Sequence, residues 1–167
     1  MVILMGVSGS GKTVVGRALA KRLGGQFVEG DDFHPASNVR RMRAGIALTD
    51  ADRWPWLERL SEAVMRARTQ GPPLVVSCAA LKKSPRRYLR DRIDGEVMFV
   101  HLSGSFDLIS RRLEARDGHF MPADLLHSQF ADLEAPESAV VVDVGEPVAR
   151  LVDRIVDSLE RPQSNAR

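Results

Sequence analysis

The sequence predicts an α/β protein, a three-layer α/β/α sandwich around a five-stranded sheet that is mostly or wholly parallel. The first observation is that strand and helix patterns alternate along the chain, which is typical of a parallel sheet with helices on both faces. The second is that several strand patterns are continuous apolar runs, as expected for strands buried on both faces. The third is a glycine-rich loop at residues 6–13, directly between the first strand and the first helix.

The predicted strands are short and occupy residues 2–5, 26–29, 74–76, 97–100 and 140–142. The first predicted helix covers residues 14–23, where apolar side chains recur at helical spacing. Gly24-Gly25 ends this helix, because glycine readily takes the left-handed conformation needed there.

A long helix is expected to begin with Asp50 or Asp52 as its cap, with Pro55 in its first turn. Its apolar stripe runs through residues 56–67, and the Gly-Pro-Pro segment at 71–73 closes it. The remaining predicted helices lie near residues 86–93, 106–116, 122–133 and 148–159.

Length and composition fit one domain, residues 1–160, followed by a polar tail, 161–167, that we expect to be disordered. The single cysteine, Cys78, rules out an internal disulfide. No segment resembles a signal peptide or a membrane span, so we expect a cytoplasmic protein without a membrane partner. The formal net charge is only +2 and the basic residues are scattered among acidic ones, which predicts no nucleic-acid partner.

The glycine-rich loop reads GVSGSGKT and predicts a nucleoside triphosphate site of the P-loop type. Its backbone N–H groups and the following helix N-terminus favour an anion. Lys12 is expected to reach the β- and γ-phosphates and to act in catalysis, and the Thr13 hydroxyl to ligate Mg²⁺. The predicted cofactors are therefore ATP and Mg²⁺, bound by Gly6, Ser8, Gly9, Ser10, Gly11, Lys12 and Thr13.

The remaining motifs narrow the class of P-loop protein. The chain contains no Asp-x-x-Gly and no Asn-Lys-x-Asp, so a GTP switch is not favoured. The apolar run 74–76 continues into Ser77 and Cys78 rather than ending in an acidic residue, which disfavours motors and most hydrolases. A small-molecule kinase is the class that these exclusions leave.

Carboxylates follow the second predicted strand, where the carboxyl ends of parallel strands gather ligands. Asp31 is the first candidate for the base that accepts the proton of the attacking hydroxyl, and Asp32 is the second. Glu29 is a candidate for organising water around Mg²⁺. The alternative for either aspartate is a cap of the next helix.

A second basic constellation lies at Arg112 and Arg116, which are four residues apart on one face of a predicted helix. A segment bounded by glycine and proline follows and predicts a small lid at about residues 117–124. Arginines on such a lid neutralise charge on the transferred phosphoryl group, so we treat both as catalytic candidates. The alternative is an exposed helix whose arginines pair with Glu114 and Asp117.

Several segments together resemble the bacterial gluconokinase family of the shikimate-kinase-like group. They are GDDFHP at 30–35 with Asn38 and Met42, LTDADRWPWL at 48–57, CAALKK at 78–83, GHFMP at 118–122, and Gln129-Phe130. The resemblance spans about residues 2–160. It implies a nucleoside-monophosphate-kinase type fold, ATP-dependent phosphorylation of the 6-hydroxyl of D-gluconate, a role in gluconate catabolism feeding the pentose phosphate or Entner-Doudoroff route, and a homodimer.

A gluconate site needs a cation opposite the carboxylate and hydrogen-bonding groups along the polyol. Arg53 and Lys82 are the first candidates for the cation, although Arg53 also suits a local ion pair with Asp50 and Asp52. His34 suits either the substrate hydroxyls or its own loop. With Asp31, Arg86 and His119 these residues complete the predicted substrate site.

Two departures from the usual family segments fall near this predicted site. Ala79 stands where the family usually has a serine, and the tyrosine and aspartate that usually follow are replaced within residues 84–87, although Arg86 keeps the arginine. The alternatives to a gluconate kinase are a kinase of another small hydroxy acid, such as shikimate, and a nucleotide-binding regulatory protein without catalysis.

Overall fold

The structure is a computed structural model, and it describes residues 1–115 and 123–160. Its centre is a five-stranded sheet in the order β2-β3-β1-β4-β5, with every neighbouring pair parallel. The prediction of a five-stranded sheet that is mostly or wholly parallel is confirmed, and the sheet is wholly parallel. The strands are β1 (Val2–Met5), β2 (Gln26–Glu29), β3 (Leu74–Ser77), β4 (Met98–Ser103) and β5 (Ala139–Asp143).

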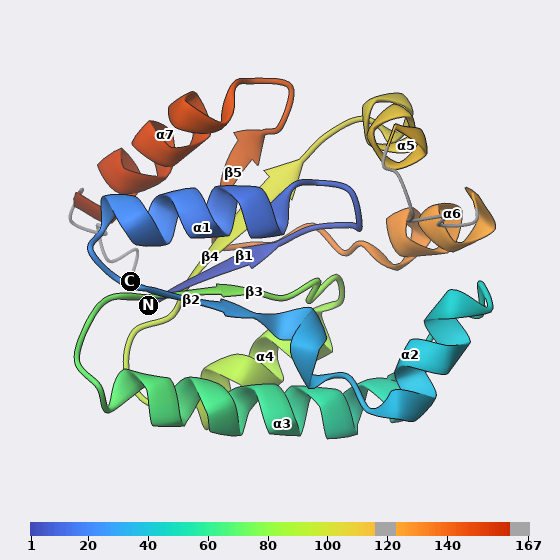
Figure 1. The fold of residues 1–167 in the computed structure, drawn as a ribbon, viewed down its shortest axis with the longest axis horizontal. Helices are drawn as coiled ribbons and strands as arrows, with labels where there is room; N and C mark the ends of the chain where they lie inside the picture. Colours follow the sequence, from blue (N-terminus) through green and yellow to red (C-terminus); the bar gives the residue numbers. More distant parts are fainter. Residues whose placement is uncertain (116–122, 161–167) are drawn as a thin grey trace.

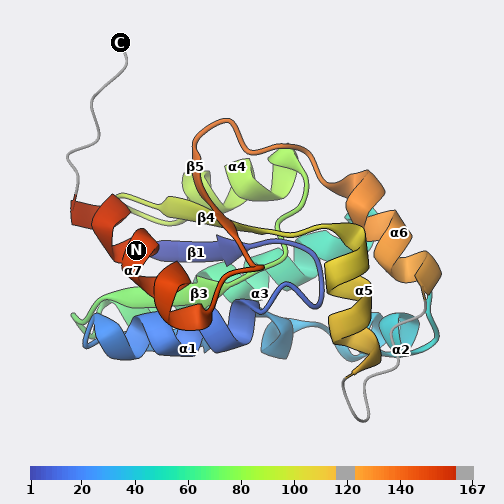
Figure 2. The ribbon, with the colours of Figure 1, turned by 90° about the horizontal axis from the view of Figure 1, so that it is seen from above.

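Helices cover both faces of the sheet and so complete the three predicted layers. Figure 1 shows α1 and α7 on one face and α3 and α4 on the other. Figure 2 shows α5 and α6 beyond the ends of the strands to which the arrows point. The helices are α1 (Lys12–Arg22), α2 (Ala36–Arg43), α3 (Asp50–Arg68), α4 (Lys83–Arg92), α5 (Phe106–Glu114), α6 (Ala123–Asp132) and α7 (Val148–Glu160), with a short 3-10 turn, η1 (Gly30–Phe33).

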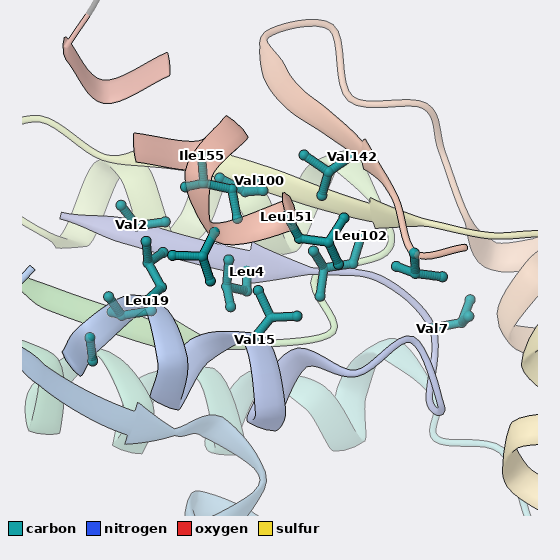
Figure 3. Close-up of a cluster of buried hydrophobic side chains, with 14 of the residues drawn as sticks. Val2, Leu4, Val7, Val15, Leu19, Val100, Leu102, Val142, Leu151 and Ile155 are labelled. Atoms are coloured by element: carbon teal, nitrogen blue, oxygen red, sulfur yellow. The ribbon is translucent and has the colours of Figure 1, made fainter. Parts of the chain in front are cut away.

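The central strand β1 divides the core into two clusters. Val2 and Leu4 join the cluster between the sheet and the α1/α7 layer, which Figure 3 shows. Ile3 and Met5 point to the opposite cluster, against α3 and α4. All four side chains are almost fully buried, and burying a large apolar side chain stabilises a fold by about 1.5–3 kcal/mol. This two-sided burial explains why the strand is apolar throughout.

Several element ends differ from the predictions. Thr49, rather than Asp50 or Asp52, caps α3, and Asp52 forms the other half of a capping box with it. Pro55 consequently lies in the second turn of α3, not the first. The strand predicted at 97–100 runs from Met98 to Ser103, and α5 ends at Glu114. Helix α2 falls in a stretch for which the sequence predicts no helix.

Some predictions concern residues outside the described part of the chain. They are the lid at 117–122, Arg116, His119 and the tail at 161–167. Residues 123 and 124, the end of the predicted lid, form the start of α6.

Among the described residues, none of the helices combines the length and the apolar character that a membrane crossing requires.

Candidate active site

The loop between β1 and α1 has the backbone of an anion-binding site. Gly9 and Gly11 have φ angles of 81° and 93°, in the left-handed region that favours glycine, and Gly11 is the N-cap of α1. A Cβ added at Gly9 would lie 2.8 Å from a side-chain carbon of Leu113, so α5 packs closely against the loop. The N-terminus of α1 presents N–H groups and a positive dipole end, and no acidic residue in its first turn offsets that charge.

The side chains of Lys12 and Gln129 form hydrogen bonds with this loop. The Lys12 ammonium donates to the carbonyl oxygens of Gly6 and Val7, at 3.0 Å each. From α6, the Gln129 carboxamide oxygen accepts from the Ser8 N–H at 2.7 Å, and its nitrogen donates to the Ser8 hydroxyl at 3.1 Å. The loop is therefore linked to α6 through Gln129, which lies 121 residues beyond Ser8 in the chain.

Thr13 and Glu29 form the oxygen pair that suits Mg²⁺. The Thr13 hydroxyl donates to Glu29 Oε2 at 2.6 Å, while Ser77 donates to Glu29 Oε1 and accepts from the Gly30 N–H at 3.0 Å. Mg²⁺ prefers hard oxygen ligands and is bound by few protein groups together with substrate phosphates. The donor set fits this ion, and the described residues contain no cluster of three or more histidine, cysteine or acidic side chains that suits a metal held by protein alone.

Asp31 lies in η1, directly after β2, and its side chain is 68% exposed. It lines the same pocket as Lys12, whereas Asp32, which is also exposed, does not line it. Neither aspartate caps the next helix, because the N-cap of α2 is Pro35 and no side chain bonds there. The capping alternative therefore does not describe either residue.

His34 is packed against the indole of Trp56. The two rings are stacked with centroids 4.2 Å apart, and the indole N–H donates to the Gly30 carbonyl at 2.7 Å. Burial lowers the pKa of His34, and the nearby Asp31 carboxylate, 3.9 Å from the ring nitrogen Nε2, opposes that shift. The imidazole is thus kept largely neutral at pH 7, as a hydrogen-bonding group at the pocket wall.

Arg53 and Lys82 also line the pocket, and both are paired with carboxylates. Arg53 contacts Asp50 at 2.8 Å and Asp132 at 2.6 Å, and Lys82 contacts the same two residues at 3.1 and 3.4 Å. The hydrogen bond from Lys82 lowers the pKa of Asp50, and the same bond raises the pKa of Lys82. The two predicted cations thus share the same pair of carboxylates.

The structure does not bring Arg86 or Arg112 to this pocket. Arg86 is buried and donates to the carbonyls of Ala80 and Leu81 at 3.0 and 2.7 Å, which holds the turn after β3, where Ala80 has a φ of 40°. Arg112 donates to the Val144 carbonyl at 2.6 Å, beyond the end of β5.

Cys78 does not supply a nucleophile to the site. Burial raises its pKa to about 12, so the thiol stays protonated at neutral pH.

One pocket is lined by four of the five described residues of the predicted substrate site, all but Arg86, and by Ser8 and Lys12 of the phosphate loop. Its wall also includes Trp56, Ser128 and Gln129, which were not among the predicted site residues. Ala79 and Pro85, two positions at which the chain departs from the family pattern, also line it. The lining residues are Ser8, Lys12, Asp31, His34, Met42, Ala47, Leu48, Arg53, Trp56, Ala79, Ala80, Leu81, Lys82, Pro85, Leu125, Ser128 and Gln129.

A phosphate-binding loop that shares a pocket with a carboxylate and two cations, on a parallel α/β sheet, defines a P-loop kinase of small anionic molecules. Comparisons with known proteins narrow this class. A family model described as "AAA domain" matches residues 1–136. The chain is 46% identical to a gluconokinase of Gluconobacter oxydans, over 90% of this chain and 80% of that protein. It is 42% identical to the thermosensitive gluconokinase of Escherichia coli, over 91% and 83%.

Solved structures agree with these relatives. A gluconokinase from Sinorhizobium meliloti aligns with a TM-score of 0.84 at 46% identity, covering 95% of this chain and 90% of that one. A sugar kinase from Janibacter aligns with a TM-score of 0.88 at 43% identity, covering 95% and 93%. A shikimate kinase from Aquifex aeolicus, at 17% identity and a TM-score of 0.60, shares the fold alone. The chain belongs to the gluconokinase family.

Proposed function

We propose that this chain is a gluconokinase, which transfers the γ-phosphoryl group of ATP to the 6-hydroxyl of D-gluconate. The observation that carries the proposal is the single pocket lined by Lys12 of the phosphate loop, by Asp31, and by the cations Arg53 and Lys82. The site for the phosphate donor, the proposed base and the site for the carboxylate of the acceptor thus belong to one cavity. The relatives named gluconokinase, matched over most of their length, support D-gluconate as the acceptor.

In the proposed mechanism, the loop N–H groups and Lys12 hold the phosphates of ATP, and Asp31 accepts the proton of the 6-hydroxyl as that oxygen attacks in line. Thr13 would hold Mg²⁺, with Glu29 hydrogen-bonded to its hydroxyl. When bound, Mg²⁺ neutralises charge that develops on the phosphoryl oxygens. Arg53 and Lys82 bind the gluconate carboxylate, and His34 bonds to its hydroxyl groups.

We propose the remaining roles from the sequence alone. Arg116 and, from the neighbouring α5, Arg112 neutralise charge on the phosphoryl group, for which Arg112 has to give up its bond to the Val144 carbonyl. His119 belongs to the substrate site, and residues 1–160 form one domain. The proposed product, 6-phospho-D-gluconate, enters gluconate catabolism in the cytoplasm. The family resemblance also supports a homodimer, which light scattering on the purified protein tests.

A panel of acceptors tests the substrate. We expect ATP consumption with D-gluconate, and rates at least about 100-fold lower with shikimate and with sugar acids of other stereochemistry, because a site built for specific hydroxyl groups leaves its polar atoms unpaired with the wrong acceptor. Preference for another acid would assign the chain to the alternative class of hydroxy-acid kinase. Consumption with none of them would favour a non-catalytic nucleotide-binding protein.

A further inference from the structure

Arg53, Lys82, Asp50 and Asp132 form a compact four-charge cluster at the acceptor end of the pocket. All four pairs between the two cations and the two carboxylates lie between 2.6 and 3.4 Å. The formal charges of the cluster cancel. Two cations proposed to attract an anionic acceptor are therefore already neutralised by the protein itself.

Asp132 and Asp50 enter this cluster differently. Asp50 uses one oxygen, Oδ1, for both cations, and it lies in the first turn of α3, three residues before Arg53. Asp132 comes from α6, 79 residues from Arg53, and divides its oxygens: Oδ2 lies 2.6 Å from Arg53 and Oδ1 lies 3.4 Å from Lys82. The carboxylate of a bound acceptor is expected to bridge Arg53 and Lys82 in the same way.

We infer that Asp132 is a specificity-determining residue that occupies, as a built-in carboxylate, the place of the acceptor's carboxylate. The inference rests on the proposed function, in which Arg53 and Lys82 bind the gluconate carboxylate. The acceptor must displace Asp132 to reach both cations. A carboxylate makes that exchange with charge balance kept, whereas an uncharged polyol leaves the cations paired with Asp132 and gains nothing from them.

The partial exposure of these side chains favours an exchange over a permanent ion pair. The side chains of Arg53, Lys82 and Asp132 are 18%, 28% and 31% exposed, so water reaches the cluster and each pair is only moderately stable. While Asp132 is paired with both cations, the protein cannot bind the acceptor carboxylate there. The apparent dissociation constant is therefore the intrinsic one divided by the fraction of protein in which Asp132 has moved away. For an ion pair of this exposure we expect a penalty of about three- to tenfold.

The test is the dissociation constant of D-gluconate, measured by calorimetry without nucleotide on the wild-type protein and on Asp132→Asn. We expect the variant to bind gluconate about three- to tenfold more tightly, because its neutral amide no longer competes. Asp132→Ser, which removes the carboxylate through a different side chain, is expected to change affinity in the same direction. Asp91→Asn is the matched control: it removes one exposed carboxylate paired with Arg87 on α4, and gluconate affinity should not change.

Each other outcome overturns the inference in a distinguishable way. Weaker binding by both variants would make Asp132 a residue that positions Arg53 and Lys82, and unchanged binding would mean that Asp132 does not compete. In both cases wild-type turnover of gluconate leaves the proposed function intact. If the wild-type protein neither binds nor phosphorylates gluconate, the proposed function fails and the inference fails with it.

Discussion

Asp31 and Lys12 reach the pocket from two separate turns, and in each case the backbone places the side chain. Lys12 is the first residue of α1, immediately after the left-handed Gly11. Asp31 follows β2 in the 3-10 turn η1, which Trp56 supports through its bond to the Gly30 carbonyl. Substitutions of Gly11 or Trp56 are thus expected to act on catalysis through position rather than through chemistry.

Two histidines link stability to pH. Burial lowers the pKa of both His34 and His101, so the folded protein holds them neutral at pH values at which the unfolded chain binds protons. The unfolded pKa is about 6.5. The free energy of unfolding should therefore fall as pH drops below about 6.5 toward the lower folded values, and it should change little from these groups above that range.

Urea unfolding at pH 7.5 and pH 5.5 checks this expectation. His101→Gln should reduce the pH-dependent loss, since one of the two groups no longer titrates. His127→Gln, at an exposed histidine on α6, serves as the control. A loss of stability that is the same in wild-type protein and His101→Gln would show that His101 does not contribute.

At the level of elements, α1 packs against β2 through a glycine. A Cβ added at Gly16 would lie 2.3 Å from the ring of Phe27, far inside contact distance. Gly16→Ala improves helix propensity by about 1 kcal/mol, but overpacking costs about 1–3 kcal/mol. We expect a net loss of about 1 kcal/mol in the free energy of unfolding, measured by urea denaturation.

The same change in a Phe27→Leu background separates the two effects. With the ring shortened, the clash is relieved and Gly16→Ala should become neutral or stabilising, so the two substitutions should not be additive. An equal loss in both backgrounds would rule out the Phe27 contact as the cause.

The elements differ in how well the sequence predicts them. The apolar strands and the amphipathic helices were predictable, because burial on a defined face imposes a period on the sequence. Helix α2 was not, because its sequence is ASNVRRMR and Asn38 is its only buried residue. The cap of α3 was predicted one or three residues late, since Thr49 and the two aspartates after it all suit an N-cap and only the backbone decides between them.

At the scale of the whole molecule, the sheet order brings both halves of the pocket together. Strand β1 lies at the centre of the sheet, β2 at one edge, and β3 between them. Because these strands are parallel, the turns that follow β1, β2 and β3 lie along one end of the sheet. Helix α6 joins them from outside, with Gln129 at the phosphate loop and Asp132 at the cations. One helix therefore contacts the donor and acceptor ends of the site.

Contacts between residues far apart in the chain are the part of the site that the sequence does not predict. Lys12, Asp31, His34, Arg53 and Lys82 were predicted and share the pocket, because local motifs place each of them at the carboxyl end of the sheet. The contact of Ser8 with Gln129 and that of Arg53 with Asp132 join residues 121 and 79 positions apart. Nothing local to Asp132 signals its partner, and Arg86, chosen by chemistry, instead holds the turn after β3.

The most direct test of the central proposal is the rate of phosphoryl transfer from ATP to D-gluconate by wild-type protein, Asp31→Asn and Asp32→Asn. If Asp31 is the base, Asp31→Asn should lower kcat by about 10²–10⁴ while nucleotide affinity stays the same, because the amide keeps the shape of the carboxylate but cannot accept the proton. Asp32→Asn, at an exposed position outside the pocket, should keep the wild-type rate. Wild-type turnover by Asp31→Asn would exclude Asp31 as the base, and a lack of transfer to gluconate by the wild-type protein would exclude gluconate as the acceptor.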